Sequence, residues 1–297
     1  MKYGTSYISS QIHDRIKNCS EYKAYNQARR GEEEPDVEGK LDPRTYLVPS
    51  ESHINHTVNA TRTKIGLISD THLCSKQQQL TFLNDFYKRC ADEGITRIYH
   101  AGDMIAGVDV YPGQANDLIR FTEDEQIDYA VEYYPYIEGI KTYVISGNHD
   151  LVFIKRKGGD PLRLISAKRK DIEYLGQFSA WVKLQENCSL YMLHPDGGGA
   201  YAASYKLQKL IESFEGGRKP NIALMGHYHR RCYVSERNVH GFLGACFESQ
   251  TDFLRRKMVQ PVIGGTILDI YFSDNGSIHD LRVNFRQYLV PKEHDWK

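Results

Sequence analysis

Short apolar runs alternate with segments of helical periodicity in the first half of the chain. The runs are rich in β-branched and aromatic residues, which is typical of buried strands, and they cover residues 64–69, 97–100 and 141–146. In the two segments between them, apolar residues recur on one helix face, over residues 83–90 and 127–134. Gly94 ends the first helical pattern and Pro135 ends the second. This repeated order of strand, turn and helix predicts an α/β layered sheet.

The second half contains more strand-like runs than helical ones. Apolar or alternating runs predict strands at residues 178–184, 189–193, 221–225, 238–244, 265–272 and 278–285. We expect the last three to be antiparallel. One amphipathic helix is predicted over residues 207–214, before Gly216 and Gly217. Together the two halves predict an α/β fold of four layers, α/β/β/α, in which two mixed sheets are flanked by helices.

The first 62 residues are expected to form an N-terminal arm or accessory segment, ahead of a domain over residues 63–290. Residues 8–25 could form a helix, residues 31–35 combine a charge run with a proline, and residues 41–50 could be extended. The segment could contact nucleic acid or another subunit, or it could wrap the main domain or be partly mobile. Its mixed charge favours the second interpretation.

Charge and composition exclude few classes of protein. The 297 residues contain 38 Lys plus Arg and 38 Asp plus Glu, so any basic patch for a polyanion must be local. No apolar run is long enough to cross a bilayer, and residues 1–6 lack the apolar core of a signal peptide. We therefore expect a cytoplasmic protein without a membrane partner. The six cysteines are scattered without a Cys-x-x-Cys pair, which predicts plain thiols in a reducing compartment.

Polar residues directly follow five of the predicted strands. They are Asp70 and His72, Asp103, Asn148 and His149, His194, and His227 and His229. Each group alone is ordinary, because Gly, Asn, His and Asp are common in turns. Ligands bind beyond the carboxyl ends of the strands in an α/β sheet, so the five groups together predict one site. Asp, His and Asn side chains bind divalent metals. The five groups contain more of these side chains than one tetrahedral ion can bind. Two ions bridged by a carboxylate are expected, an arrangement suited to displacement at phosphorus.

The ordered motifs resemble the calcineurin-like metallophosphoesterase superfamily, from about residue 64 to about residue 230. The motifs are Asp70-x-His72, Gly102-Asp103, Gly147-Asn148-His149-Asp150, His194 and Gly226-His227-x-His229. The runs at residues 80–86 and 194–201 also resemble phage-borne members of the superfamily.

The resemblance implies a role for each motif residue. Asp70, His72 and His229 would hold one metal, Asn148, His194 and His227 the other, and Asp103 would bridge the two. His149 would sit over the substrate, where it stabilises the transition state or protonates the leaving oxygen. A hydroxide shared by the two ions would attack phosphorus in line. Manganese is the expected metal, with iron, zinc, cobalt or nickel as alternatives.

One position departs from the family pattern. Many members carry an acid three residues after the Gly-Asp aspartate, where it orients the catalytic histidine, but this chain has Ala106 there. The partner of His149 therefore stays open, and Asp109 is one candidate. The glycine-rich run at residues 195–199 could approach a phosphate closely or could be a plain connection.

Basic residues are dense after the histidine turn and again near residue 255. They are Lys155, Arg156, Lys157, Arg163, Lys168, Arg169, Lys170 and, beside Phe253, residues 255–257. Near a two-metal site they could hold a phosphodiester backbone or a nucleotide, although charge runs are also usual on solvated helix faces. The expected substrate-binding residues are Asn148, Arg156, Lys157, Gly198 and Tyr201.

These observations predict a hydrolase, namely a two-metal phosphodiesterase that acts on nucleic acid as a nuclease, or on nucleotides. A phosphomonoesterase, a cyclic-nucleotide phosphodiesterase and a non-catalytic scaffold of the same fold are the alternatives. The scaffold is the least favoured of these because such proteins typically lose ligands, and none of the ligand positions is lost here. The resemblance also admits a homodimer.

Overall fold

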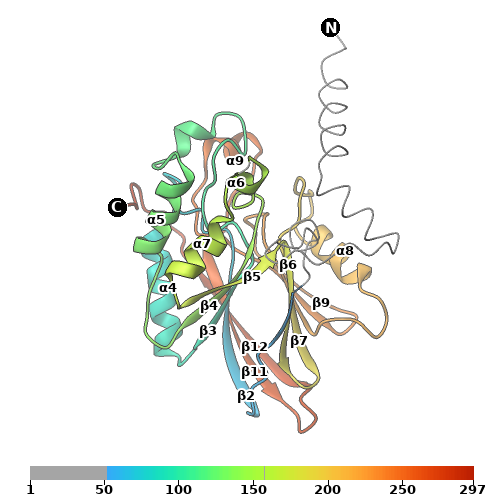
Figure 1. Ribbon diagram of the computed structural model, residues 1–297. Helices are drawn as coiled ribbons and strands as arrows, with labels where there is room; N and C mark the ends of the chain where they lie inside the picture. The colour runs from blue at the N-terminus through green and yellow to red at the C-terminus, as the bar shows by residue number, and fades with distance from the viewer. Residues whose placement is uncertain (1–51, 157) are drawn as a thin grey trace, which may run out of the picture. The chain divides into compact units, whose positions relative to one another are not determined.

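The computed structural model describes residues 52–156 and 158–297 (Figure 1). The helix expected over residues 8–25, the extended segment expected over residues 41–50 and the candidate residue Lys157 lie outside this part of the chain. Among the described residues, no helix is both long and apolar enough to span a bilayer.

One six-stranded mixed sheet contains the three strands predicted in the first half of the chain. Its parallel strands are β2 (Arg62–Ile68), β3 (Arg97–His100), β4 (Lys141–Ser146) and β5 (Ile172–Gln177). The antiparallel strands β11 (Gly264–Phe272) and β12 (Ile278–Gln287) extend this sheet beyond β2. Because β2, β3 and β4 are parallel neighbours, their carboxyl ends meet at one edge.

The second six-stranded sheet is also mixed. Its strands, in spatial order, are β1 (Ser52–Asn55), β6 (Ser179–Gln185), β7 (Cys188–Leu193), β8 (Ile222–Met225), β10 (Val239–Leu243) and β9 (Cys232–Glu236). Strands β7, β8 and β10 are parallel, so β7 and β8 also end at a common edge.

The two sheets pack face to face through a shared apolar layer (Figure 1). Alternate residues of a strand point to opposite faces, so Ile65 and Leu67 of β2 belong to this layer while Ile68 belongs to the core under the helices. The first sheet is covered by α4 (Leu80–Asp92), α5 (Glu123–Tyr133) and α7 (Pro161–Lys168), and the second by α8 (Tyr205–Ser213). This arrangement confirms the predicted α/β/β/α fold of two mixed sheets.

Several elements have no counterpart in the hydrophobic pattern. They are β1, β5, β9, α7 and the short helices α6 (Val152–Lys155), α9 (Asp252–Arg256) and η1 (Gln114–Asp117). Helix α7 lies in the basic stretch and starts by capping, because the Asp160 side chain accepts from the amide of Arg163 and Pro161 follows Asp160.

The expectation that the last strands are antiparallel is wrong for one of them. Strand β10 pairs with β8 in parallel, and β9 pairs with β10 antiparallel. Arg237 and Asn238 have positive φ angles of 51° and 60°, as a two-residue hairpin requires. The hairpin places β9 at the sheet edge and returns β10 beside β8, in the direction of β8.

Part of the segment that was expected to be accessory belongs to the second sheet. Residues Ser52–Asn55 form β1, which pairs with β6. Just after it, the His56 ring centroid lies 4.2 Å from that of Tyr143, and His56 Nδ1 lies 2.9 Å from the Tyr99 hydroxyl. The domain boundary at residues 62–63 stays a prediction, because residues 1–51 lie outside the described part of the chain.

Candidate metal centre

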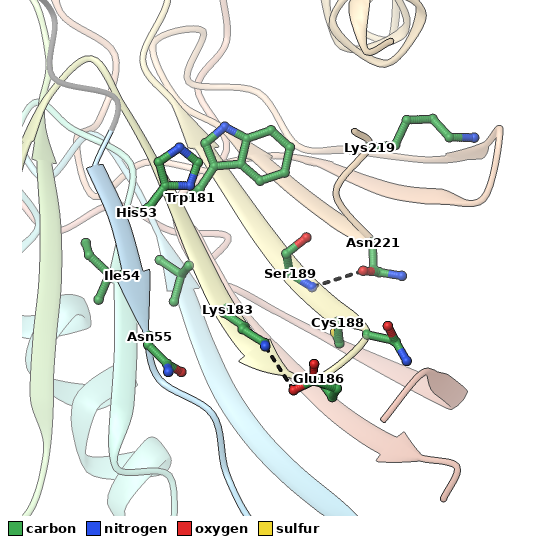
Figure 2. Close-up of a pocket in the computed structure, with 12 residues that line it drawn as sticks. His53, Ile54, Asn55, Trp181, Lys183, Glu186, Cys188, Ser189, Lys219 and Asn221 are labelled. Carbon is green, nitrogen blue, oxygen red and sulfur yellow. Dashed lines mark hydrogen bonds and ion pairs between the residues drawn. The ribbon is translucent and has the colours of Figure 1, made fainter. Parts of the chain in front are cut away.

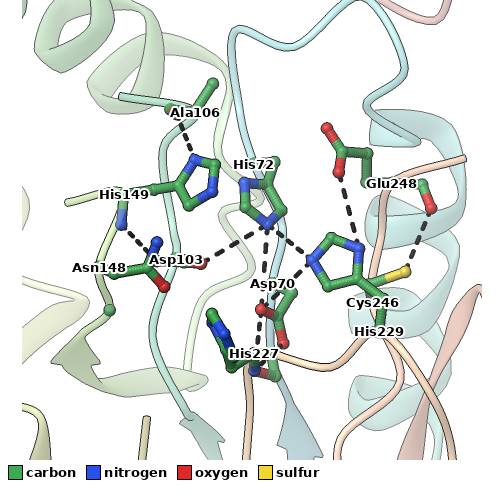
Figure 3. A network of polar contacts seen from close by, with 12 residues as sticks. Asp70, His72, Asp103, Ala106, Asn148, His149, His227, His229, Cys246 and Glu248 are labelled. Atoms are coloured by element: carbon green, nitrogen blue, oxygen red, sulfur yellow. Dashed lines mark hydrogen bonds and ion pairs between the residues drawn. The ribbon is translucent and has the colours of Figure 1, made fainter. Parts of the chain in front are cut away.

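The predicted polar clusters converge where five strands end (Figure 3). Asp70 and His72 follow β2, Asp103 follows β3, and Asn148 and His149 follow β4 in the first sheet. From the second sheet, His194 follows β7, and His227 and His229 follow β8. The common direction of these strands within each sheet explains why residues far apart in the sequence meet.

Asp70, His72 and His229 form one buried group of potential ligands. The Nε2 atoms of His72 and His229 approach to 3.0 Å, and His229 Nε2 lies 3.5 Å from Asp70 Oδ1. Burial lowers the pKa of His72, which favours the neutral imidazole that binds metals. Two imidazole nitrogens and a carboxylate oxygen turned toward one another suit a divalent cation.

A second group contains Asp103, His194 and His227, with Asn148 beside them. His194 Nε2 lies 3.2 Å from Asp103 Oδ2 and 3.1 Å from Asn148 Oδ1. Asp103 Oδ2 also lies 3.8 Å from His72 Nε2, so this carboxylate stands between the two groups. The geometry therefore offers two adjacent sets of nitrogen and oxygen ligands that share Asp103.

In the second group, Asp103 and His194 shift the pKa values of each other. Burial alone would raise the pKa of Asp103, but His194 and His149 outweigh it and hold this pKa well below its usual range. Burial likewise works to lower the pKa of His194, but Asp103 outweighs it and raises this pKa to about 9. A metal ion at this position would have to displace the proton from His194.

Backbone conformation at these positions is strained. Asp70, His72, Asp103, His227 and His229 all have positive φ angles, from 42° to 82°. Such angles cost about 1 kcal/mol or more for residues other than glycine and cluster at functional sites. The left-handed conformation occurs in the loops after the strands, at residues whose side chains come together in the two candidate ligand groups.

Two motif glycines are required by close approach. A Cβ atom at Gly147 would overlap the carboxylate of Asp103, and one at Gly226 would overlap the Ala101 carbonyl oxygen. Larger residues at either position would push apart the loops that carry the potential ligands.

Buried hydrogen bonds fix the ligand side chains. His194 Nδ1 donates to the Ala101 carbonyl oxygen at 2.7 Å, so Nε2 is the nitrogen that would bind a metal once its proton is displaced. The backbone amide of His227 donates to both carboxylate oxygens of Asp70 at 3.0 Å. Such supporting contacts orient ligands before an ion binds.

His149 is oriented by a backbone group. Its Nδ1 lies 2.5 Å from the Ala106 carbonyl oxygen, which can only accept, so Nδ1 carries the proton. Asp109, the candidate partner from the sequence, instead pairs with Arg156 at 2.9 Å. Burial lowers the pKa of His149. The ring centroid of His149 lies 4.4 Å from that of His72, and these two histidines with Asp103 form a third set of potential ligand atoms.

Asp150 ties two of the loops together. Its carboxylate accepts from the amides of Gly147 at 2.8 Å, Asp103 at 2.9 Å, Ile105 at 3.1 Å and Met104 at 3.3 Å. Its bond with the Gly147 amide supports its own turn. The structure shows that it also holds the loop that carries Asp103.

Sequence reasoning missed Glu248 as a neighbour of the site. Its Oε2 lies 3.7 Å from His229 Nδ1, and this nitrogen has no hydrogen-bond partner among the described residues. Burial raises the pKa of Glu248 to about 7. Glu248 follows no predicted strand end and lies beyond the region of the recognised motifs, so the sequence carries no local signal for it.

The expected substrate-binding residues lie in different surroundings. Asn148 is within the second ligand group, and Arg156 is exposed and paired with Asp109. Gly198 and the fully exposed Tyr201 belong to the loop in which the Gly197 carbonyl oxygen lies 2.8 Å from His227 Nε2. Of the remaining basic stretch, Arg169 is structural, because its guanidinium binds Asp171 and three backbone carbonyl groups.

A separate hollow of about 560 Å³ lies on the second sheet (Figure 2). Its lining includes His53 of β1, Trp181 of β6 and Asn221 at the start of β8. None of the candidate metal ligands contributes to it. Because β8 begins here and ends at the metal ligands, the hollow is remote from the candidate site.

Comparisons with known proteins agree with this description. Residues 63–244 match the family model of the calcineurin-like phosphoesterase superfamily domain. The DNA polymerase II small subunit of Halobacterium salinarum is 34% identical over 118 residues, which are 37% of this chain and 21% of that protein. The subunit of the same name from Methanocaldococcus jannaschii is 26% identical over 243 residues, which are 66% of this chain and 40% of that protein.

The chain therefore spans between about a fifth and two fifths of the length of these curated relatives. Among solved structures, an archaeal phosphodiesterase aligns with a TM-score of 0.44 and 16% identity, over 75% of this chain and 100% of that one. The likeness to phage-borne members stays a prediction. The family match extends over more than half of the chain and contains all the motifs at the strand ends, so the chain belongs to the calcineurin-like phosphoesterase superfamily.

Proposed function

We propose that the chain is a metal-dependent phosphodiesterase that hydrolyses nucleic acid. The observation that carries the proposal is the pair of ligand groups sharing Asp103, with His149 beside them. In this proposal Asp70, His72 and His229 hold one ion, Asn148, His194 and His227 hold the other, and Asp103 contacts both. Two divalent ions at these positions, manganese before iron, zinc, cobalt or nickel, would neutralise phosphoryl oxygens and activate water.

His149 supplies the proton for the leaving oxygen. Its Nδ1 proton stays with the Ala106 carbonyl, so Nε2 is the nitrogen that exchanges a proton with the substrate. The lowered pKa of His149 makes its charged form a stronger acid but a minority near neutral pH, so Nε2 must take up the proton from water before it donates it. The backbone carbonyl of Ala106 is sufficient to orient His149. The absence of an acidic side chain at position 106 therefore does not argue against the role of His149.

Nucleic acid is the substrate best supported by the surroundings of the site. Tyr111 and Phe253 stack on each other near His149, and Arg156 and Lys257 lie in the same region. Aromatic and cationic side chains together suit a nucleotide chain. The relatives named as DNA polymerase small subunits add a connection to DNA.

A second candidate is a subunit that binds a DNA polymerase assembly and does not hydrolyse its substrate. The names of the curated relatives favour it. The complete ligand set argues against a purely structural role, because ligands that bind nothing would only strain the fold.

A homodimer is also part of the proposal and would double the mass measured by light scattering.

The decisive experiment measures hydrolysis by the full chain with Mn²⁺. The substrates are bis(p-nitrophenyl) phosphate, p-nitrophenyl phosphate, single-stranded DNA and double-stranded DNA. We expect the diester and DNA to be cleaved, with loss of activity in chelator and in Asp103→Asn. Hydrolysis of the monoester alone would reject the nuclease proposal, and no turnover despite bound metal would favour the subunit that only binds.

A further inference from the structure

We propose that Tyr111 and Phe253 form an aromatic wall that stacks on the nucleobase of the leaving nucleotide. This inference rests on the proposed function, because it assigns one side of the substrate at the same site. It goes further in that it names the part of the substrate recognised and the side chains that recognise it.

The aromatic wall is built from two segments far apart in the sequence. Tyr111 lies between β3 and α5, and Phe253 lies in α9, yet their ring centroids are 4.5 Å apart with an interplanar angle of 21°. The Tyr111 hydroxyl donates to Asp117 at 3.0 Å, and Thr251 caps α9 by accepting from the amide of Leu254. Both rings are therefore held in place, and both are only half-buried.

The aromatic wall adjoins the proton donor. The Tyr111 ring centroid lies 6.3 Å from that of His149. Tyr111 shares a loop with Asp109 and with Ala106, whose carbonyl oxygen accepts the hydrogen bond from His149. When the bond from phosphorus to the leaving oxygen breaks, that oxygen takes its proton from His149. The group attached to the leaving oxygen must therefore lie on the His149 side of the site, beside the Tyr111 ring.

Positive charge accompanies the aromatic wall. Lys257 Nζ lies 5.7 Å from the centroid of the Phe253 ring, and Arg156 is held at the same side by Asp109. A phosphate one nucleotide beyond the scissile bond would meet these cations. Rings beside cations bind successive nucleotides through stacking and backbone charge, with little dependence on base identity.

The chemical class of the leaving group follows from these features. Tyr111 and Phe253 cover one face of each other, so the wall would bind a base on its outer side. It suits a purine or pyrimidine equally, whereas a methyl or sugar leaving group would gain nothing from stacking. A nucleotide chain with a base on the leaving side is thus the expected substrate.

The test compares dinucleotides that differ by a single base. With Mn²⁺, kcat/KM is measured for dTpdT and for the two versions in which a tetrahydrofuran abasic nucleoside replaces either side. In the wild type, removing the base on the leaving side should lower kcat/KM by about 5- to 100-fold. In Tyr111→Leu and Phe253→Leu, the ratio between base and abasic substrates should fall toward one.

Conservative variants and a control separate stacking from structure. Tyr111→Phe and Phe253→Tyr keep the rings and should retain the ratio. Tyr136→Leu removes another exposed aromatic side chain, ahead of β4 and thus away from the carboxyl strand ends, and should also retain it. Two results would overturn the proposal that the aromatic wall stacks on the base. One is an equal kcat/KM of the wild type for the substrates with and without the base, and the other is an unchanged ratio in the leucine variants.

A failed proposed function is distinguishable from a failed aromatic wall. If no dinucleotide is cleaved, the nuclease proposal is wrong, and the wall is tested by binding of labelled oligo(dT) and an abasic oligomer in Ca²⁺. Weaker binding of the abasic oligomer, lost in Phe253→Leu, would then support a base-binding wall without catalysis. Equal affinities would overturn it.

Discussion

A histidine that donates its Nδ1 proton to a carbonyl oxygen is fixed in one tautomer without a negative charge beside it. In this chain the carbonyl belongs to Ala106, at 2.5 Å from His149 Nδ1. A carboxylate at the same place would raise the pKa of the imidazole as well as orient it. Here burial lowers the pKa of His149 and outweighs the opposing effects of Asp103 and of the Ala106 hydrogen bond that orients the ring.

Replacement of His149 with glutamine should slow catalysis without releasing metal. General acids contribute about 10²- to 10⁴-fold to rate, so kcat should fall by this order while bound Mn²⁺ stays near the wild-type content. Both are measurable, by a diesterase assay and by elemental analysis of the dialysed protein. Loss of Mn²⁺ together with activity would show that His149 is a ligand.

Asp150 is a second residue whose effect should reach the metal site from outside it. Its carboxylate accepts four backbone hydrogen bonds, and an asparagine would turn an NH₂ group toward some of these donors. We expect Asp150→Asn to lower the free energy of unfolding by about 2–4 kcal/mol and to weaken Mn²⁺ binding. Denaturant titration and metal titration would check this.

The matched control is Asp171→Asn, which changes a carboxylate that pairs with Arg169 near the start of β5. It should leave Mn²⁺ affinity unchanged. Equal metal affinity in Asp150→Asn and in the wild type would refute the proposed link between the two loops.

The residues that converge as candidate metal ligands could be identified from the sequence, whereas the groups that support them could not. Asp70, Asp103 and His194 stand directly after apolar strands, and that position is visible in the sequence. The Ala106 carbonyl is a backbone group that every residue possesses, so no side chain announces it. Glu248 reaches His229 only through tertiary packing.

At the scale of elements, hydrophobic periodicity predicted the strands that are buried on both faces and missed three of the four edge strands, namely β1, β5 and β9. Strands β2, β3 and β4 are continuous apolar runs because helices and a second sheet cover them. Strands β1 and β9 alternate between half-buried and exposed residues, since they lie at the edges of the second sheet. Helix α7 was missed because it is short and its buried face carries only Pro161, Leu162 and Ile165.

The segment after β1 predicts a pH dependence of stability. Burial and the neighbouring Arg97 lower the pKa of His56 from 6.5 to about 4. The unfolded chain binds a proton in this range that the folded chain excludes. The stabilising contribution is therefore complete above pH 6.5 and is lost as the pH falls from 6.5 toward 4. Because His56 is only half-buried, the loss should be on the order of 1 kcal/mol.

His56→Phe should remove this part of the pH dependence. Thermal unfolding of both proteins between pH 4 and pH 7.5 measures it, with His53→Phe as a control on the same segment. An unchanged difference in stability between pH 7.5 and pH 4.5 would show that His56 is not the titrating group.

At the scale of the whole molecule, the described residues account for both sheets and for every candidate ligand. Strand β1 closes one side of the second sheet although it precedes the region of the family match. The balance of 38 basic and 38 acidic residues gives no overall attraction to DNA, so binding must depend on local groups near the site.

Two truncated chains should distinguish the contribution of residues 1–51 from that of strand β1. A chain that starts at residue 52 should unfold cooperatively and keep Mn²⁺-dependent activity. A chain that starts at residue 61 loses β1 and His56, so its Tm should fall by about 5 °C or more, corresponding to roughly 2 kcal/mol. Calorimetry and the diesterase assay measure both.

The DNA affinity of the chain that starts at residue 52 tests the role of residues 1–51. A chain starting at residue 52 that keeps its fold but loses DNA affinity would assign nucleic-acid binding to those residues. Equal Tm values for the two truncations would mean that β1 contributes nothing to the stability of the second sheet.

The left-handed backbone at Asp70, His72, Asp103, His227 and His229 has a consequence for the stability of the fold. At about 1 kcal/mol or more each, five such residues oppose a sizeable share of the 5–15 kcal/mol by which a domain is typically stable. Glycine would relax the backbone, but at Asp70 and Asp103 it would also remove carboxylates that accept backbone hydrogen bonds. The candidate site is thus held in its geometry at the expense of stability in the surrounding loops.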